Sequence, residues 1–212
     1  MPISKKYKCL FIHIPKTGGT SIEAALGILG NWKIEDRDSL FGEIQSEELK
    51  NYDYISHFLQ HLTYEQCQNI TPVDKNYRSF SFIRNPWDRM VSIYSNMDNN
   101  LVSMAKRQKI NLNDLSFTEF IETIDNLEHI HLVPQYKFIY NKKEKLCIDF
   151  IGRFESFQKD FNALCNQLNK KIELPHINRS QHKPYRDYYS QKTKKIIAKK
   201  YKKDIELFGY EY

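Results

Sequence analysis

Apolar and polar positions follow two spacings along this chain. Short runs rich in apolar and β-preferring residues predict strands, near residues 7–14, 52–56, 78–84 and 146–152. Apolar residues at helical spacing predict helices, near residues 20–29, 63–69, 86–97, 116–126 and 156–169. Strands that alternate with helices favour an α/β fold, a central parallel β-sheet flanked by helices. No repeat or glycine- and proline-rich linker divides the 212 residues, so we predict a single domain over 1–212.

Three long segments between these elements have no clear period. Residues 97–115 and 127–145 are polar, and we expect them to form connections that face a substrate. Residues 175–189 carry basic and hydroxyl side chains and are expected to form a loop with affinity for anions.

The first candidate site follows the first predicted strand. Pro15 ends that strand, and Lys16, Thr17, Gly18, Gly19, Thr20 and Ser21 then lead into a helix. Glycines let backbone N–H groups approach a ligand, and a helix N-terminus adds unpaired N–H groups. The order differs from the nucleotide-binding P-loop, Gly-x-x-x-x-Gly-Lys-Ser/Thr, because the lysine precedes the glycines. The segment therefore predicts a P-loop-like site for a phosphate or a sulfate. The alternative is a plain glycine turn between strand and helix.

A second candidate site follows the predicted strand 78–84. Arg84 stands where that strand ends, which is where open α/β sheets bind ligands. Pro86 suits the first turn of the next helix, and Ser92 lies two turns into it. Arg89 is expected to pair with Asp88 or with another acid. For Arg84 the alternative is an ordinary surface ion pair. Two anion sites in one small chain suggest a ligand that is phosphorylated at two places.

These two segments together resemble the sulfotransferases that use 3′-phosphoadenosine 5′-phosphosulfate (PAPS), and most of all the branch that includes carbohydrate O-sulfotransferases. Residues 151–160, 174–180, 184–189 and 204–210 resemble later parts of the same family, so that the likeness runs from about residue 8 onward. The resemblance implies that residues 16–21 hold the 5′-phosphosulfate and that Arg84 and Ser92 hold the 3′-phosphate. It also implies that Arg179 and Lys183 lie near the nucleotide.

Sulfuryl transfer to a hydroxyl needs a base, in-line geometry and a stabilised leaving group, and it requires no metal. Lys16 is expected to neutralise the charge that grows on the leaving phosphate. A histidine is the natural base near neutral pH. His57 follows the predicted strand 52–56 and resembles the catalytic histidine of many carbohydrate members, whereas His61 is the alternative. His13 is interpreted as structural.

The net charge of the chain bears on its possible partners. The formal net charge is +6, and seven lysines lie between residues 192 and 203 with no acid among them. Ile196, Ile197 and Tyr201 give that segment an apolar face, so we predict a solvated amphipathic helix. The alternative is peripheral contact with an anionic glycan or lipid surface. No nucleic-acid motif accompanies the lysines.

The four cysteines lack metal-like spacing, and Cys9 and Cys147 are expected to be buried thiols in strands.

The sequence contains no apolar run long enough to span a membrane and no signal-peptide pattern at its start. We therefore expect a cytoplasmic enzyme of bacterial or viral origin. Its predicted activity is PAPS-dependent O-sulfation of a hydroxyl, with a carbohydrate as the expected acceptor. The alternatives are a nucleotide-dependent kinase, which the missing Gly-Lys-Ser/Thr sequence disfavours, and a non-catalytic module that binds a nucleotide or a glycan.

Overall fold

The structure, a computed structural model, describes residues 2–28, 59–70, 73–175, 177 and 182–212. Its contacts group the chain into two compact units. The sheet unit comprises residues 1–83 and 135–178, and the helical unit comprises residues 84–134 and 179–212. The single domain expected over 1–212 stays a prediction.

The sheet unit is built on four strands in the order β1-β2-β3-β4. These are β1 Ile3–Ser4, β2 Cys9–Ile12, β3 Arg78–Ile83 and β4 Phe150–Arg153. The pairs β2–β3 and β3–β4 are parallel, whereas β1 pairs with β2 in antiparallel fashion, with Ile3 opposite Leu10. The α/β class is confirmed, but the expectation of a purely parallel sheet is wrong at this edge. A turn over residues 5–8 reverses the chain, so the edge strand runs against its neighbour.

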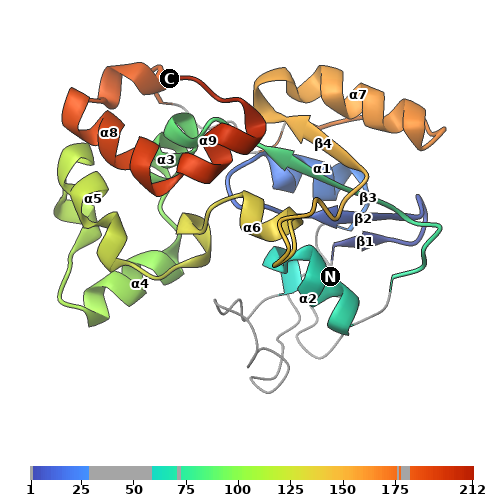
Figure 1. Cartoon of the computed structure of the whole chain (residues 1–212), viewed down its shortest axis with the longest axis horizontal. Helices are drawn as coiled ribbons and strands as arrows, with labels where there is room; N and C mark the ends of the chain where they lie inside the picture. The colour runs from blue at the N-terminus through green and yellow to red at the C-terminus, as the bar shows by residue number, and fades with distance from the viewer. Residues whose placement is uncertain (1, 29–58, 71–72, 176, 178–181) are drawn as a thin grey trace. The chain divides into compact units, whose positions relative to one another are not determined.

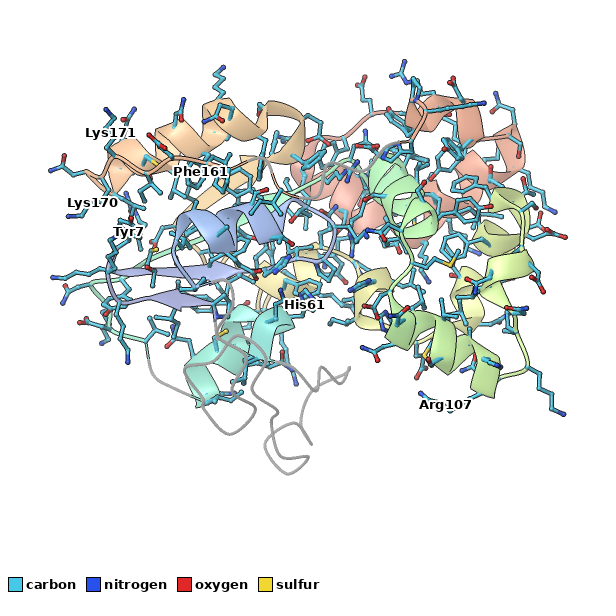
Figure 2. The ribbon with its side chains drawn as sticks, turned by 180° about the vertical axis from the view of Figure 1, so that it is seen from behind. Tyr7, His61, Arg107, Phe161, Lys170 and Lys171 are labelled. Carbon is cyan, nitrogen blue, oxygen red and sulfur yellow. The ribbon has the colours of Figure 1, made fainter. Side chains whose placement is uncertain are left out.

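Helices cover the sheet, and in Figure 1 α7 lies on the side opposite α2 and α6. The helical segments of this unit are α1 Gly19–Ala25, η2 Leu59–His61, α2 Tyr64–Ile70, α6 Tyr136–Ile139, η6 Phe154–Ser156 and α7 Phe157–Gln167. Side chains of β2 and β3 such as Phe11 and Phe82 pack with Ile22 of α1 and with Phe161 of α7, which Figure 2 labels. Strand residues alternate between the two faces of the sheet, so Phe80 and Phe82 of β3 lie on the same face and both belong to this core.

The helical unit has its own core. Its segments are α3 Pro86–Ser95, α4 Asn99–Arg107, η3 Leu112–Asp114, α5 Phe117–Thr123, η4 Ile124–Asn126, η5 Ile130–Leu132, η7 Tyr185–Tyr188, α8 Gln191–Lys200 and α9 Lys202–Phe208. Helix α3 packs against α5 and α8, and α5 packs against α8. Met90 of α3, Phe120 of α5 and Tyr201 are fully buried there.

Several expected boundaries need correction. Residues 97–115 are not a plain connection, because α4 forms over Asn99–Arg107. The Asp98 side chain caps this helix by accepting from the N–H groups of Asn100 and Leu101. The connection 127–145 likewise contains η5 and α6. The strand expected over 146–152 begins only at Phe150, which leaves Cys147 half-buried outside it. The strand expected over 52–56 lies outside the described residues.

The lysine-rich segment is helical and packs on its apolar face, as predicted. Ile197 and Tyr201 are buried. Several of its lysines also have partners within the helical unit. Lys192 pairs with Glu122 at 2.6 Å, and Lys200 pairs with Asp125 at 2.8 Å. The Lys194 ammonium lies 3.8 Å from the ring centroid of Tyr212. These contacts favour the amphipathic-helix interpretation over an open cationic surface.

Candidate anion-binding site

The first predicted site is a tight turn between β2 and α1. His13 and Ile14 follow the strand, and residues 15–18 then reverse the chain into the helix. Lys16 has φ 69° and Gly18 has φ 88°, so both adopt the left-handed backbone region. Such a backbone can turn successive N–H groups toward one concave side, which is the geometry of anion-binding nests. Lys16, in the same turn, is half-buried.

Two of the hydroxyls proposed as ligands hold the turn itself. The Thr17 hydroxyl is buried and donates to the carbonyl of Ile14 at 2.9 Å. The Ser21 hydroxyl donates to the carbonyl of Ile177 at 3.2 Å and accepts from the N–H of Ile177 at 3.1 Å. Thr20 is half-buried. Thr17 and Ser21 therefore fix the loop, and the backbone amides together with Lys16 are the groups best suited to a ligand.

The two glycines of this loop also make room for side chains of the sheet unit. A Cβ on Gly18 would lie 2.7 Å from the ring of Phe157, at the start of α7. A Cβ on Gly19 would overlap the imidazole of His13. Both positions thus require the absence of a side chain for packing, and Gly18 requires it also for its left-handed backbone.

A buried polar cluster lies beside the loop. His13 Nδ1 is 2.6 Å from Oε1 of Glu23, and the Gln60 amide donates to both carboxylate oxygens of Glu23 at 3.1 Å. His61 Nδ1 donates to the carbonyl of His13 at 3.1 Å, and the two imidazole rings meet edge to face with centroids 4.7 Å apart. Figure 2 labels His61 beside α2. Sequence reasoning assigned no role to Glu23 or Gln60.

The second predicted site belongs to the helical unit. Arg84 is buried, and its Nε donates to Asp88 at 2.7 Å. Ser92 is also buried, one helical turn after Asp88 on the same face of α3. An ion pair, the alternative given for Arg84, is present, but it is buried and not at the surface. Asp88 therefore holds the guanidinium on the side of α3 that carries Ser92.

Arg89 behaves differently from Arg84. Its guanidinium is buried and donates to the carbonyl of His131 at 2.8 Å and to that of Val133 at 3.0 and 3.1 Å. Burial lowers the pKa of this guanidinium from its ordinary value, although Tyr201 and Asp204 favour the charged form. Asp88, one of its expected partners, pairs instead with Arg84. Arg89 thus helps to hold the helical unit together.

The aromatic residues near the end of the chain are packing residues of the helical unit. The Tyr189 hydroxyl donates to the carbonyl of Trp87 at 2.8 Å. The rings of Tyr188 and Tyr189 meet Phe117 edge to face. Trp87 is buried and donates its indole N–H to the carbonyl of Lys194 at 3.1 Å. Trp87 is therefore a packing residue of the helical unit as well.

The remaining predicted site residues are His57, Arg179 and Lys183. His57 and Arg179 lie outside the described residues. Lys183 is exposed at the start of the segment that leads into η7.

No group of three or more potential metal ligands occurs among the described residues. None of the described helices combines the length and apolarity that a membrane span needs.

The cysteines are free thiols. Cys9 is buried, as predicted, and burial raises its pKa to about 12. Burial likewise raises the pKa of Cys67 to about 12. Cys147 is less buried than expected, and its thiol donates to the carbonyl of Lys145 at 3.3 Å. All four lie in the sheet unit. The high pKa values leave Cys9 and Cys67 protonated near neutral pH and unsuited to act as nucleophiles.

A parallel strand that leads through a basic, glycine-containing turn into a helix is an arrangement that many α/β proteins use to bind phosphate or sulfate groups. The chain belongs to the sulfotransferase family, whose family model matches residues 1–211. The resemblance described from the two motifs is thereby confirmed.

The chain is also similar to carbohydrate sulfotransferase 14 of Danio rerio. The two are 23% identical over 239 aligned residues, which cover 98% of this chain and 61% of the relative. The chain therefore spans about three fifths of the length of that relative. No solved structure gave a significant match.

Proposed function

We propose that this protein transfers a sulfuryl group from PAPS to a hydroxyl group, and that the acceptor is a carbohydrate. The observation that carries the proposal is the β2–α1 turn, with its left-handed backbone at Lys16 and Gly18. Membership of the sulfotransferase family and similarity to a carbohydrate sulfotransferase support the reaction and the acceptor class.

The residues of the turn fit the phosphosulfate end of the donor. Residues 16–21 offer backbone N–H groups and one ammonium in a loop that its own hydroxyls hold in place. PAPS supplies an activated sulfuryl group, whose S–O bond to phosphate breaks as the acceptor oxygen bonds to sulfur. Lys16 stabilises the negative charge on the released phosphate. Most of the rate enhancement then comes from positioning and electrostatics, by analogy with phosphoryl transfer.

Arg84 and Ser92 are proposed to bind the 3′-phosphate. Asp88 accepts from Nε of Arg84 at 2.7 Å and so orients the guanidinium, a planar cationic group of the kind that recognises phosphate. Arg179 and Lys183 are proposed to contact the nucleotide. His57 is proposed as the base that removes the proton of the acceptor hydroxyl, with His61 as the alternative.

Calorimetric titration with 3′-phosphoadenosine 5′-phosphate tests the donor site. The wild type should bind, and Arg84→Ala should weaken binding by about 1.5–3 kcal/mol, as expected for a hydrogen bond to a charged group. Arg107→Ala is the matched control, because Arg107 is an exposed arginine of the same unit outside the predicted sites. Absence of binding in the wild type would overturn the proposal.

Turnover separates the remaining alternatives. His57→Ala should abolish sulfate transfer and keep donor binding, whereas a fully active His57→Ala variant would exclude His57 as the base. Transfer of labelled phosphate from ATP would favour a kinase. Donor binding without turnover across a broad panel of acceptors would favour a binding module.

A further inference from the structure

The loop between β2 and α1 is closed by a side-chain contact. His13 is the residue directly after β2, and Glu23 lies one turn inside α1. Their 2.6 Å contact therefore joins the residue before the loop to a residue after it. Both side chains are buried, with Glu23 fully so.

Glu23 is the centre of the hydrogen bonds in this cluster. Its buried carboxyl group accepts from the Gln60 amide at both oxygens, and His13 Nδ1 is a third partner at 2.6 Å. These three contacts compensate for the burial of the carboxyl group. Glu23 is therefore the acceptor on which His13 and Gln60 converge.

The imidazole of His13 transmits this contact to the loop. It occupies the space that a Cβ of Gly19 would need, so the ring rests directly on the first residue of α1. Its backbone carbonyl accepts from His61 Nδ1, which ties the short helix η2 to the same residue. A change at Glu23 would therefore remove the contact that holds the His13 ring against the loop. It would also remove the contact that holds η2 through Gln60.

We propose that Glu23 is a positioning residue for the anion-binding loop. Through His13 it fixes the backbone where residues 16–19 enter α1, and through Gln60 it fixes η2 against the same helix. The inference rests on the proposed function for the nature of the anion, because the phosphosulfate group is what the positioned loop would hold. Loss of the contact should loosen the loop and weaken donor binding.

The test compares Glu23→Ala with two matched variants. Asp149→Ala removes another acid of the sheet unit, which accepts from the N–H and the hydroxyl of Ser79 near the start of β3. That position is at the end of the parallel strands opposite the loop. Glu23→Gln is the conservative variant, since its amide oxygen can accept from His13 while its NH₂ group donates to a turned Gln60.

Hydrogen exchange of the ligand-free protein gives the first measurement. Exchange of the peptide that covers residues 13–21 should be about tenfold faster in Glu23→Ala than in the wild type. It should be unchanged in Asp149→Ala and close to wild type in Glu23→Gln. Unchanged exchange in Glu23→Ala would overturn the proposal. If Glu23→Ala does not fold, Gln60→Leu replaces it, with a smaller acceleration expected in the same peptide.

Titration with 3′-phosphoadenosine 5′-phosphate gives the second measurement. A loop that is misplaced by a fraction of an ångström should lose affinity by about tenfold in Glu23→Ala and by less than about threefold in the two matched variants. Equal weakening of nucleotide binding in Asp149→Ala would mean that the loss in Glu23→Ala reflects general destabilisation, and it would overturn the proposal. A wild type that does not bind this nucleotide would refute the proposed function, while the exchange measurement would still decide the role of Glu23.

Discussion

The two units use buried polar side chains for different purposes. In the sheet unit, His13, Glu23 and Gln60 gather where β2 ends, directly beside a loop of unusual backbone conformation. In the helical unit, the buried Arg89 donates to main-chain carbonyls of residues 131 and 133. The first cluster lies beside the candidate anion-binding loop, whereas the second ties the segment 131–133 to α3. A buried charge indicates function only when its neighbours lead to a surface that can hold a ligand.

The arginines of the helical unit sharpen this comparison. Arg84 and Arg89 are five residues apart and equally buried, yet Arg84 meets an acid and Arg89 meets carbonyls. The Arg84 guanidinium is oriented by a carboxylate on its own helix, whereas that of Arg89 ties the segment 131–133 to α3. The resemblance assigns Arg84 to the 3′-phosphate, and the role of Arg89 in packing agrees with its having no part in that assignment.

The largest effect is expected at Arg89. Arg89→Met should lower the free energy of unfolding by about 2–5 kcal/mol, because the carbonyls of His131 and Val133 lose charged donors. Urea denaturation followed by circular dichroism measures the change. Arg107→Met is the control, with an expected change within about 0.5 kcal/mol for an exposed residue. A loss at Arg89 as small as that of the control would show that the buried arginine is not structural.

A glycine in the sheet unit should have the next largest effect. A Cβ on Gly152 of β4 would overlap the Phe82 ring of β3, so Gly152→Ala should destabilise the protein by about 1–3 kcal/mol. Phe82→Leu shortens the opposing side chain and should relieve part of this cost in the double variant. Chemical denaturation of the four proteins gives the coupling energy. Strictly additive losses would show that the cost of Gly152→Ala does not come from overlap with the Phe82 ring.

The smallest expected effect is a pH dependence of stability that comes from His129 in the helical unit. His129 lies 3.7 Å from Asp98, but burial is the larger influence and lowers the pKa of His129 below its ordinary value. The folded state therefore disfavours the proton that the unfolded chain takes up below about pH 6.5. Stability from this group is complete above that pH and falls as the pH drops toward the lowered pKa.

Thermal unfolding between pH 7 and 5 measures this dependence. His129→Gln should flatten part of the decline, whereas His182→Gln, a histidine of the same unit outside this pair, is the control. A steeper decline in His129→Gln than in the wild type would show that the Asp98 contact outweighs burial and would reverse the sign.

Parts of the fold were predictable because their signals are local. Strand β3 and helix α3 were predicted within one or two residues, since the apolar run 79–83 and Pro86 mark both boundaries. Helix α4 was missed, although Asp98 as a cap and the pair Leu101 and Ala105 at helical spacing were present. The antiparallel edge strand was missed because two residues give no measurable period.

The sequence by itself determined the family, and it predicts the anion-binding loop and the residues proposed to hold two phosphates, because these depend on residue types at fixed short spacing. Tertiary structure decided which polar groups serve the loop. Glu23 meets His13 across ten residues and Gln60 across 37. Thr17 and Ser21 use their hydroxyls on the protein itself. Contacts between distant residues depend on how a strand, a turn and a helix pack together, and no spacing along the chain encodes that geometry.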